Sequence, residues 1–268
     1  MSTILDQIIA EKKREIAKYK PLSSIERFEK EGFFWEFSNR SLRDRLLAAD
    51  NTGIIAEFKR KSPSKGWFKP KELEVEQVVT TYNKLGAVGI SVLTDDAFFG
   101  GDLDDLIQTK VISDIPVLRK DFIIDKWQIA ESKAFGADVI LLIAACLSAQ
   151  EVAELAGYAR SIGLEVLLEV HDEHELGHIC EHISMVGVNN RDLQTFTVDI
   201  NRSLELIHKI PASIPAIAES GISNVESIVT LKQAGFRGFL VGEAFMKEEQ
   251  PGKAFGEFVN KLAAATGV

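Results

Sequence analysis

The feature that most constrains the fold of this chain is an alternation of short apolar runs with longer amphipathic stretches, beginning near residue 54. Each run is rich in Ile, Val and Leu, as expected for strands buried on both faces of a parallel sheet. The predicted strands cover residues 54–58, 88–93, 116–118, 139–143, 165–169, 185–188, 216–219 and 239–241. The alternation therefore predicts eight successive β-then-α units.

Helical features separate these strands. In residues 148–162, apolar residues recur at helical spacing behind a capping box of Ser148 and Glu151, and Ser223 with Glu226 is predicted to open another helix. Glycines that can end helices in short loops precede later strands at Gly86, Gly136 and Gly235. This punctuation supports the alternation.

Eight β-then-α units are typical of a closed (β/α)8 TIM barrel, an α/β fold. No G-x-G-x-x-G follows the first strand, so a dinucleotide-binding sheet is not indicated, although periodicity alone leaves a doubly wound open sheet as the alternative. At 268 residues and 46% hydrophobic composition the chain can bury one large core. We predict a single domain over residues 1–268, with the barrel in residues 51–268.

Residues 1–50 do not follow the β-then-α pattern and are predicted to form a helical N-terminal extension packed on the barrel. Capping pairs at Ser23/Glu26 and Ser41/Asp44 indicate two or three helices. One side of the first helix is expected to pack on the barrel through Ile4, Leu5, Ile8, Ile16 and Tyr19. A second apolar group, expected to pack as core, consists of Phe33, Phe34, Trp35 and Phe37.

The net charge of −9 argues against a nucleic-acid partner, because such binding usually needs a basic surface. Local cations can still form a positive pocket for a small anionic substrate. Cys146 and Cys180 are too few for a disulfide-stapled secreted scaffold, and no apolar run has membrane-spanning length. We expect a cytoplasmic protein without a membrane partner.

Catalytic groups of such barrels project from the C-terminal ends of the strands. Glu57 and Lys59 lie two residues apart at the first strand end, so both should point into the barrel mouth, where Lys120 and Glu169 join them. An ion-pair network that only closes the barrel top is the structural alternative. Four such charges at strand ends favour acid/base catalysis.

Phosphate binding is predicted from the loops after the seventh and eighth strands, where many barrels bind phosphate through backbone N–H groups. Ser220-Gly221 and Gly242 stand there, and Lys59 and Arg191 add positive charge. Each glycine alone could merely serve a tight turn. Together with the cations, they favour a phosphorylated small-molecule substrate.

Four of the five histidines follow the fifth predicted strand, at positions 171, 174, 178 and 182. Their spacing could line one helix face and hold a metal, but the charged stretch around them favours a solvated helix without metal. The mouth is then expected to contain no histidine. Lysine and glutamate would carry the protons.

Seven segments of the chain resemble the indole-3-glycerol phosphate synthase family, in order and along nearly the whole length. They are IIAEFKRKSPSKG (54–66), SVLTDDAFFGG (91–101), PVLRKDFIID (116–125), LLEVHDE (167–173), VGVNNRDLQTF (186–196), AESGIS (218–223) and LVGEAFM (240–246). The resemblance implies a carboxy-lyase of tryptophan biosynthesis. It would convert 1-(2-carboxyphenylamino)-1-deoxy-D-ribulose 5-phosphate to indole-3-glycerol phosphate, carbon dioxide and water, with neither cofactor nor metal.

The resemblance also implies roles for individual residues. Lys120 is the expected general acid for ring closure, while Glu57, Lys59 and Glu169 share the dehydration, with acid and base unassigned among them. The implied catalytic set is completed by Asn189, Glu219 and Ser220. The implied phosphate site consists of Lys59, Ser62, Arg191, Ser220, Gly221, Gly242 and Glu243. The anthranilate ring is expected between Phe99, Phe122 and Leu141, which could equally be barrel core.

Two positions depart from the family pattern. Glu243 stands where some relatives carry a hydroxyl residue, so its backbone N–H is expected to face the phosphate while its carboxylate turns away. Asp102 stands where serine is common, and it should cap the following helix equally well.

Other barrel functions remain as alternatives. Phosphoribosylanthranilate isomerase and the tryptophan synthase α subunit are phosphate-binding barrels, but the set of two acids and two lysines argues against both. A barrel kept as a binding or scaffold subunit should lack catalytic groups, and this sequence lacks none of them. The sequence is compatible with a monomer or a weak dimer.

Overall fold

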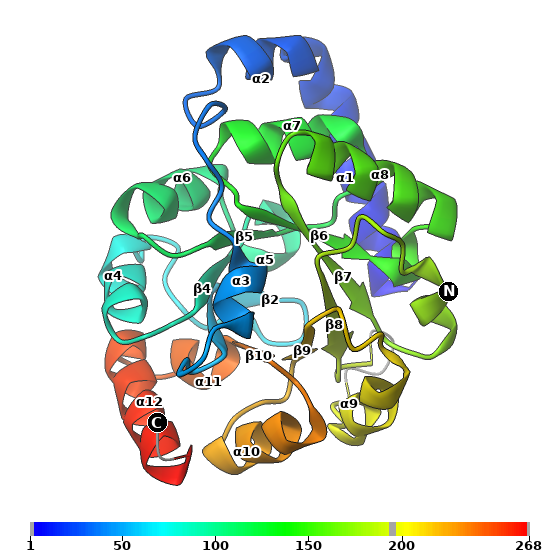
Figure 1. Cartoon of the computed structure of the whole chain (residues 1–268). Helices are drawn as coiled ribbons and strands as arrows, with labels where there is room; N and C mark the ends of the chain where they lie inside the picture. Colours follow the sequence, from blue (N-terminus) through cyan, green and yellow to red (C-terminus); the bar gives the residue numbers. More distant parts are fainter. Residues whose placement is uncertain (1–2, 193–196, 267–268) are drawn as a thin grey trace.

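Eight parallel strands close into a barrel in the order β1-β10-β9-β8-β7-β6-β5-β4, with helices around the outside (Figure 1). The structure is a computed structural model that describes residues 3–192 and 197–266. Because the sheet closes on itself, the predicted (β/α)8 barrel is confirmed and the open doubly wound sheet is excluded.

All eight predicted strands are present, each within two residues of its predicted ends. They are β1 (Ile54–Phe58), β4 (Gly89–Leu93), β5 (Val117–Lys120), β6 (Val139–Ile143), β7 (Glu165–Val170), β8 (Met185–Asn189), β9 (Ala216–Glu219) and β10 (Gly238–Val241). The largest difference is at β5, which continues to Lys120 because Lys120 pairs with Leu93 of β4. Lys120 therefore belongs to the rigid strand itself.

A small hairpin outside the barrel was not predicted. It consists of β2 (Lys61–Ser62) and β3 (Gly66–Trp67), which pair antiparallel directly after β1. The hairpin fixes Ser62 on a short strand instead of leaving it in an irregular loop.

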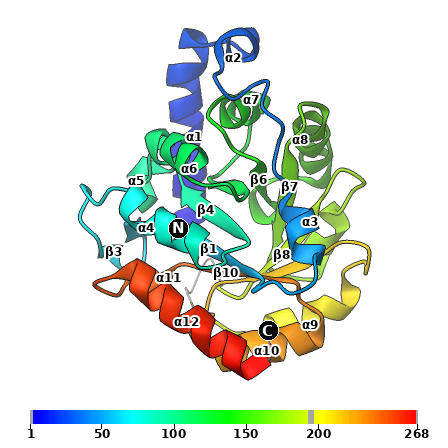
Figure 2. The same ribbon diagram turned by 60° about the vertical axis from the view of Figure 1, so that its left-hand side comes forward.

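The helices of the barrel end near their predicted glycines. They are α4 (Glu76–Lys84), α5 (Asp96–Phe99), α6 (Leu103–Ile112), α7 (Lys126–Ala134), η2 (Ala144–Cys146), α8 (Ala149–Ser161), η3 (His174–His178), α9 (Asn201–Leu206), η4 (Ile207–Lys209), α10 (Val225–Ala234), α11 (Glu243–Met246) and α12 (Pro251–Thr266). The last of them, α12, packs against both α4 and α10 and so closes the helical ring (Figure 2).

Side-chain caps explain where several helices start. The Ser148/Glu151 capping box of α8 and the Asp102 cap of α6 are confirmed. The predicted cap at Ser223 is wrong, because Asn224 accepts the N–H of Ser227 and opens α10. The positive φ angles of the three predicted helix-ending glycines, 91° at Gly86, 96° at Gly136 and 117° at Gly235, agree with the prediction.

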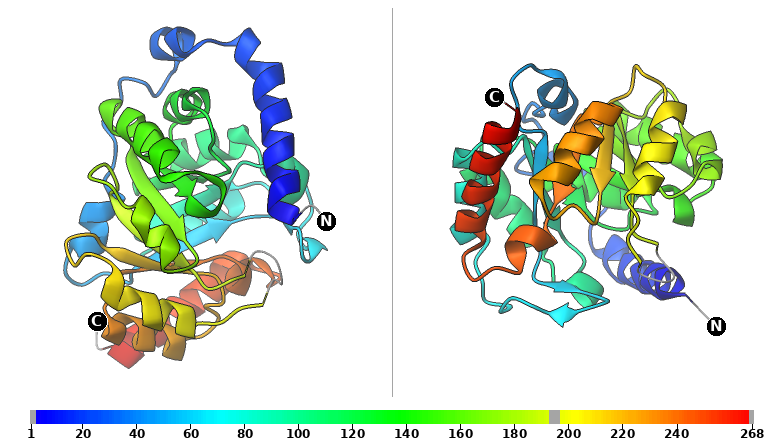
Figure 3. Two further views of the ribbon diagram at one scale, coloured as in Figure 1. Left: turned by 90° about the vertical axis from the view of Figure 1, so that its right-hand side faces the viewer. Right: turned by 90° about the horizontal axis from the view of Figure 1, so that it is seen from below.

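Three helices and one 3-10 turn precede the barrel: α1 (Ile4–Tyr19), η1 (Lys20–Leu22), α2 (Ile25–Glu31) and α3 (Leu42–Leu47). Helix α1 runs along one side of the barrel, and α2 lies beyond the C-terminal end of α1 (Figure 3). Ser41 caps α3 as predicted, whereas α2 is capped by Ser24 and not by Ser23. Ser24 is the residue directly before the helix, and its hydroxyl accepts the N–H of Arg27.

The extension buries fewer aromatic side chains than predicted. Tyr19 is exposed, and Phe33 and Phe37 are also exposed, with 73% of Phe33 accessible. Phe33, Phe34 and Phe37 contact one another, but only Phe34 is buried. The prediction of a common core was wrong for Phe33 and Phe37, because their segment lies outside the strands and helices that form the core.

Helix α3 closes the N-terminal end of the barrel. Leu42 and Leu46 are fully buried and join the side chains inside the barrel, including Ile55 and Met185. Glu165 accepts hydrogen bonds from the N–H groups of Leu42 and Arg43, which fixes the start of α3. With this end closed, a ligand must enter from the C-terminal end of the strands.

Helix α1 is attached at that open end. Lys12 is buried and pairs with Asp95 at 2.9 Å and with Asp121 at 3.1 Å. Asp121 directly follows Lys120 in the sequence. The buried ion pairs therefore hold α1 next to the end of β5.

The expected organisation, one domain with residues 1–50 packed on the barrel of residues 51–268, is tested by Leu42. Leu42→Ala should lower the free energy of unfolding by about 2–5 kcal/mol, because it opens a cavity at the barrel end. Leu47→Ala, in the same helix at a 48% exposed position, should change it by less than about 0.5 kcal/mol. Denaturant unfolding measures both, and equal effects would contradict the packing of α3 as part of the core.

Candidate active site

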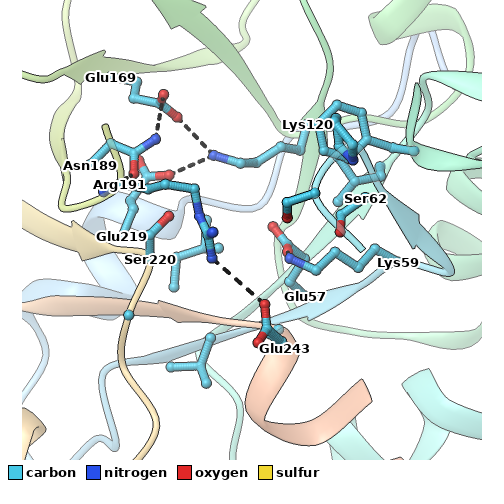
Figure 4. A pocket seen from close by; sticks show the side chains of 18 of the residues that line it. Glu57, Lys59, Ser62, Lys120, Glu169, Asn189, Arg191, Glu219, Ser220 and Glu243 are labelled. Atoms are coloured by element: carbon cyan, nitrogen blue, oxygen red, sulfur yellow. Dashed lines mark hydrogen bonds and ion pairs between the residues drawn. The ribbon is translucent and has the colours of Figure 1, made fainter. Parts of the chain in front are cut away.

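A cavity of about 410 Å³ opens at the C-terminal ends of the strands. All the residues predicted for catalysis, phosphate binding and the ring wall line it: Glu57, Lys59, Ser62, Phe99, Lys120, Phe122, Leu141, Glu169, Asn189, Arg191, Glu219, Ser220, Gly221, Gly242 and Glu243. Figure 4 shows the charged and polar side chains among them. They come from elements far apart in the sequence, which barrel closure brings to one mouth. The roles of these residues stay predictions.

Lys120 lies between two carboxylates. Its Nζ is 2.9 Å from Glu169 Oε2 and 2.5 Å from Glu219 Oε2 (Figure 4). Burial disfavours the ammonium charge, but the negative charges of Glu169, Glu219 and Glu57 outweigh it and raise the pKa of Lys120 above its usual value. Lys120 is therefore a cation held in place by two strands across the barrel.

Glu169 is held as a carboxylate. Its Oε1 accepts a hydrogen bond of 2.9 Å from Asn189 Nδ2, and Asn189 Oδ1 accepts the backbone N–H of Arg191. Burial opposes the charge of Glu169, but Lys120 and His171 lower its pKa to about 2. Asn189 thus orients Glu169 towards Lys120.

The pKa of Glu219 is shifted in the opposite direction to that of Glu169. Burial, with the negative charge of Glu169, raises the pKa of Glu219 to about 7 even though Lys120 opposes the rise. A Cβ on Gly187 would collide with Glu219 Oε1, so the absence of a side chain on β8 makes room for this carboxyl group. One of the two carboxyls beside Lys120 can therefore be neutral near pH 7.

A second ion pair stands apart from this group. Lys59 Nζ lies 2.7 Å from Glu57 Oε1, and Glu57 is buried at the end of β1. A Cβ on Gly242 would collide with Glu57, so the glycine after β10 gives this carboxylate its space. The four predicted charges form two clusters, and Glu219 joins the one around Lys120.

The phosphate side of the cavity combines a hydroxyl, two turns and a cation. Ser62 Oγ is buried and has no hydrogen-bond partner among the described residues. Ser220 and Gly221 both have left-handed backbones, with φ of 65° and 75°. A non-glycine residue in this region carries backbone strain, which is concentrated at functional sites.

Glu243 differs from its expected orientation. Its carboxylate lies 3.6 Å from Arg191 and 2.5 Å from Lys65, instead of turning away (Figure 4). Burial opposes the charge of Glu243, but the hydrogen bond from Lys65 and the nearby cations lower its pKa. In this state Glu243 neutralises the cation that was predicted to bind phosphate.

The apolar wall is larger than predicted. Phe99 and Phe122 lie with their ring centroids 6.0 Å apart, and Leu141 is buried beside the cavity. Three apolar residues of α1 also line it: Ile4, Leu5 and Ile8. The sequence showed the apolar face of α1 but not that this face covers the mouth.

The sequence predicted a mouth without histidine, and the described residues that line the cavity include none. His171 lies just outside this lining, with its Nε2 3.5 Å from Glu169 Oε1. Instead of the expected solvated helix, this stretch forms only the short 3-10 helix η3. His174 is exposed, and His178 Nε2 lies 3.0 Å from the carbonyl oxygen of Leu147. In residues 3–192 and 197–266, no three His, Cys, Asp or Glu side chains could jointly hold a metal ion.

The arrangement can protonate a developing oxyanion and can exchange protons between amines and carboxylates. The side of the cavity with Ser62, Ser220 and Arg191 can bind an anion, and the aromatic side chains can hold a flat ring.

Residues 193–196, which end the fifth matching segment, lie outside the described residues. Within the part that is described, no helix is long and apolar enough to span a membrane.

Known sequences are similar to nearly the whole chain. Residues 5–258 match the family model described as "Indole-3-glycerol phosphate synthase". Proteins with that name from Bacteroides thetaiotaomicron and Variovorax paradoxus are 46% and 42% identical. The first alignment covers 98% of this chain and 100% of the relative, and the second covers 95% and 98%.

Solved structures show likeness of fold. A 3-hexulose-6-phosphate synthase matches with a TM-score of 0.59 at 16% identity, covering 79% of this chain and 98% of that chain. A variant tryptophan synthase α subunit from Pyrococcus furiosus matches with a TM-score of 0.60 at 15% identity, covering 79% and 97%. At such low identities, these matches show only that the barrel fold is the same.

The raised pKa of Glu219 predicts a carboxyl that is protonated below and ionised above about pH 7. Carbon-13 NMR of the glutamate side chains should show one such titration in the wild type. Glu219→Gln should remove it, whereas Glu249→Gln at an exposed position should leave it unchanged. If no glutamate titrates near pH 7, the proposed environment of Glu219 is incorrect.

Proposed function

This chain belongs to the indole-3-glycerol phosphate synthase family, and from that premise we propose which of its residues perform the family's reaction. The enzyme is a carboxy-lyase of tryptophan biosynthesis that closes the indole ring of a phosphorylated anilino-ribulose with loss of carbon dioxide and water. One observation carries the assignment of residues: a partly buried lysine cation lies between two buried carboxyls in a cavity with an aromatic wall.

Lys120 is the general acid of ring closure. The ring carbon that bears the carboxylate attacks the ketone, whose oxygen gains negative charge and takes a proton from the Lys120 ammonium. The anthranilate ring then regains aromaticity by expelling carbon dioxide. A charged donor fixed by Glu169 and Glu219 needs little reorganisation as the oxyanion forms, which is the main source of such stabilisation.

Glu57 and Lys59 perform the dehydration. Lys59 donates a proton to the departing hydroxyl, and Glu57 accepts a proton from the neighbouring carbon. The 2.7 Å between Lys59 Nζ and Glu57 Oε1 lets Glu57 return that proton to Lys59. This assignment leaves Glu169 and Glu219 to hold Lys120, and Asn189 to orient Glu169.

The phosphate is bound at the rim by Arg191, Lys59 and the hydroxyl of Ser62. The backbone turns at Ser220-Gly221 and Gly242-Glu243 complete this site, and Ser220 also contacts the sugar hydroxyls. Glu243 must give up its contact with Arg191 when the phosphate binds, because the two anions repel each other. Phe99, Phe122 and Leu141 hold the anthranilate ring.

We propose that the protein is cytoplasmic and is a monomer or a weak dimer. Its two cysteines are free, which suits a reducing compartment. All the groups assigned to the reaction come from one chain, so activity does not require a partner subunit.

Lys120→Ala should lower turnover by at least about a thousandfold, because it removes both the proton donor and the charge that stabilises the oxyanion. Indole fluorescence during incubation with the carboxyphenylamino ribulose phosphate measures the rate. Lys71→Ala, at a 68% exposed position, serves as the control and should retain the wild-type rate.

Carbon dioxide release separates the two steps in the same assay. Lys120→Ala should lose carbon dioxide release and indole formation together, whereas Glu57→Gln should release carbon dioxide ahead of indole. A near-normal rate in Lys120→Ala would refute its role, and absence of turnover in the wild type would refute the proposed function.

Arg191 and Glu243 should affect substrate binding in opposite directions. Arg191→Ala should raise KM about tenfold by removing a charge-assisted phosphate contact, with a smaller effect on kcat. Glu243→Gln should lower KM, because Arg191 is then no longer neutralised by a carboxylate. Arg14→Ala, on the exposed face of α1, is the control. An unchanged KM in Arg191→Ala would place the phosphate elsewhere.

A further inference from the structure

Each turnover of the proposed reaction consumes one proton, because a substrate carboxylate leaves as neutral carbon dioxide. Glu57 and Lys59, which perform the dehydration, undergo no net change in bound protons, since Glu57 accepts one proton for the one that Lys59 gives. The unreturned proton is therefore the one that Lys120 transfers to the ketone oxygen. Lys120 must be recharged from solvent, although only 15% of its side chain is exposed.

We propose that His171 is the proton reservoir that recharges Lys120 through Glu169. This inference rests on the proposed function, because it concerns the proton balance of that reaction. His171 does not line the cavity and does not touch the reacting atoms, so its part is to supply a proton to the groups that do.

The geometry places the imidazole in a row of four ionisable groups. Its Nε2 lies 3.5 Å from Glu169 Oε1, and its Nδ1 lies 3.3 Å from Glu175 Oε2. Glu169 Oε2 in turn lies 2.9 Å from Lys120 Nζ. The row leads from the amine at the cavity floor to Glu175 of η3, next to exposed residues 172–174.

His171 Nε2 is buried and lacks a hydrogen-bond partner among the described residues. Leaving a buried polar nitrogen without a partner costs free energy, so fold stability does not account for this position. The nitrogen faces a carboxylate oxygen that already accepts a hydrogen bond from Asn189 Nδ2. A small approach of the ring would form the missing hydrogen bond along the path to Lys120.

The surroundings favour a charged imidazole. The charged groups facing it are Glu169 on β7, Glu175 on η3 and, further away, Glu219 on β9. Burial disfavours the imidazolium, but the hydrogen bond to Glu175 and the charge of Glu169 raise the pKa of His171 above its usual value. The ring therefore keeps its proton to a higher pH than an ordinary histidine does.

The transfer balances in three steps. The imidazolium gives its Nε2 proton to Oε1 of the Glu169 carboxylate, whose pKa is no longer lowered by a charge on Lys120. The carboxyl group then turns about its Cγ–Cδ bond, and the protonated oxygen gives the same proton to the neutral Lys120 amine. Solvent then returns one proton to the neutral imidazole, while Glu175 stabilises the charge that forms. The net change is one proton taken from solvent for each carboxylate lost as carbon dioxide.

The first turnover needs no recharging, because Lys120 starts as a cation, whereas each later turnover does. Stopped-flow indole fluorescence on full-length His171→Asn should therefore show a first turnover within about twofold of the wild type. Steady-state turnover should fall about a hundredfold, the lower end of what a positioned proton donor contributes. Added imidazole should restore it in proportion to its concentration, and the deficit should shrink as pH rises through the pKa of His171, because the wild type then loses its charged imidazole as well.

Two further variants separate proton supply from structure. His174→Asn, in the same segment but exposed, should behave as the wild type. Glu175→Gln keeps an acceptor for the His171 backbone N–H but removes the charge, and it should lower steady-state turnover without slowing the first turnover.

Three outcomes would overturn the inference. In His171→Asn these are wild-type steady-state turnover, an equal slowing of the first and later turnovers, and a loss that imidazole does not restore. The first would show that solvent recharges Lys120 directly, and the other two that His171 only holds Glu169 in position. Failure of the wild type to form indole would instead contradict the proposed function itself.

Discussion

The ion pairs of Lys120 with Glu169 and Glu219 are the interaction on which the rest of the site depends. Two carboxyls are buried beside a partly buried amine, which is tolerable only where each group finds an opposite charge or loses its own. The carboxyls come from β7 and β9, and the amine from β5 across the mouth. Barrel closure sets these distances, and Gly187 leaves the space that Glu219 needs.

The two ends of the barrel differ: one is closed by apolar side chains, and the other carries the cavity. Leu42 and Leu46 of α3 fill the N-terminal end with apolar side chains. At the other end, α1 is fastened by Lys12 to Asp95 and Asp121, and its apolar face lines the cavity. An apolar wall lowers the local dielectric constant and so strengthens the electrostatic interactions of the charges beside it.

The charges at the mouth are divided among three groups, and this division suits the function proposed above. Glu57 and Lys59 form a pair that, in that proposal, donates and accepts in turn and so ends a turnover unchanged. The group around Lys120 would end short of one proton, which the proposed reservoir, His171 beside Glu169, would supply. Arg191 and Glu243 form a third pair, which a phosphate bound at the proposed site would separate.

Apolar periodicity and glycine punctuation, which are local properties of the chain, predicted the eight strands and the residue types at their ends. They left the open sheet as an alternative, which closure of the barrel excludes. The sequence did not determine that Glu219 shares Lys120 with Glu169, that His171 stands behind Glu169, or that the carboxylate of Glu243 faces Arg191. It also overestimated the burial of Phe33 and Phe37. Only the tertiary structure decided these points, because they depend on distances between segments far apart in sequence, which closure of the barrel sets.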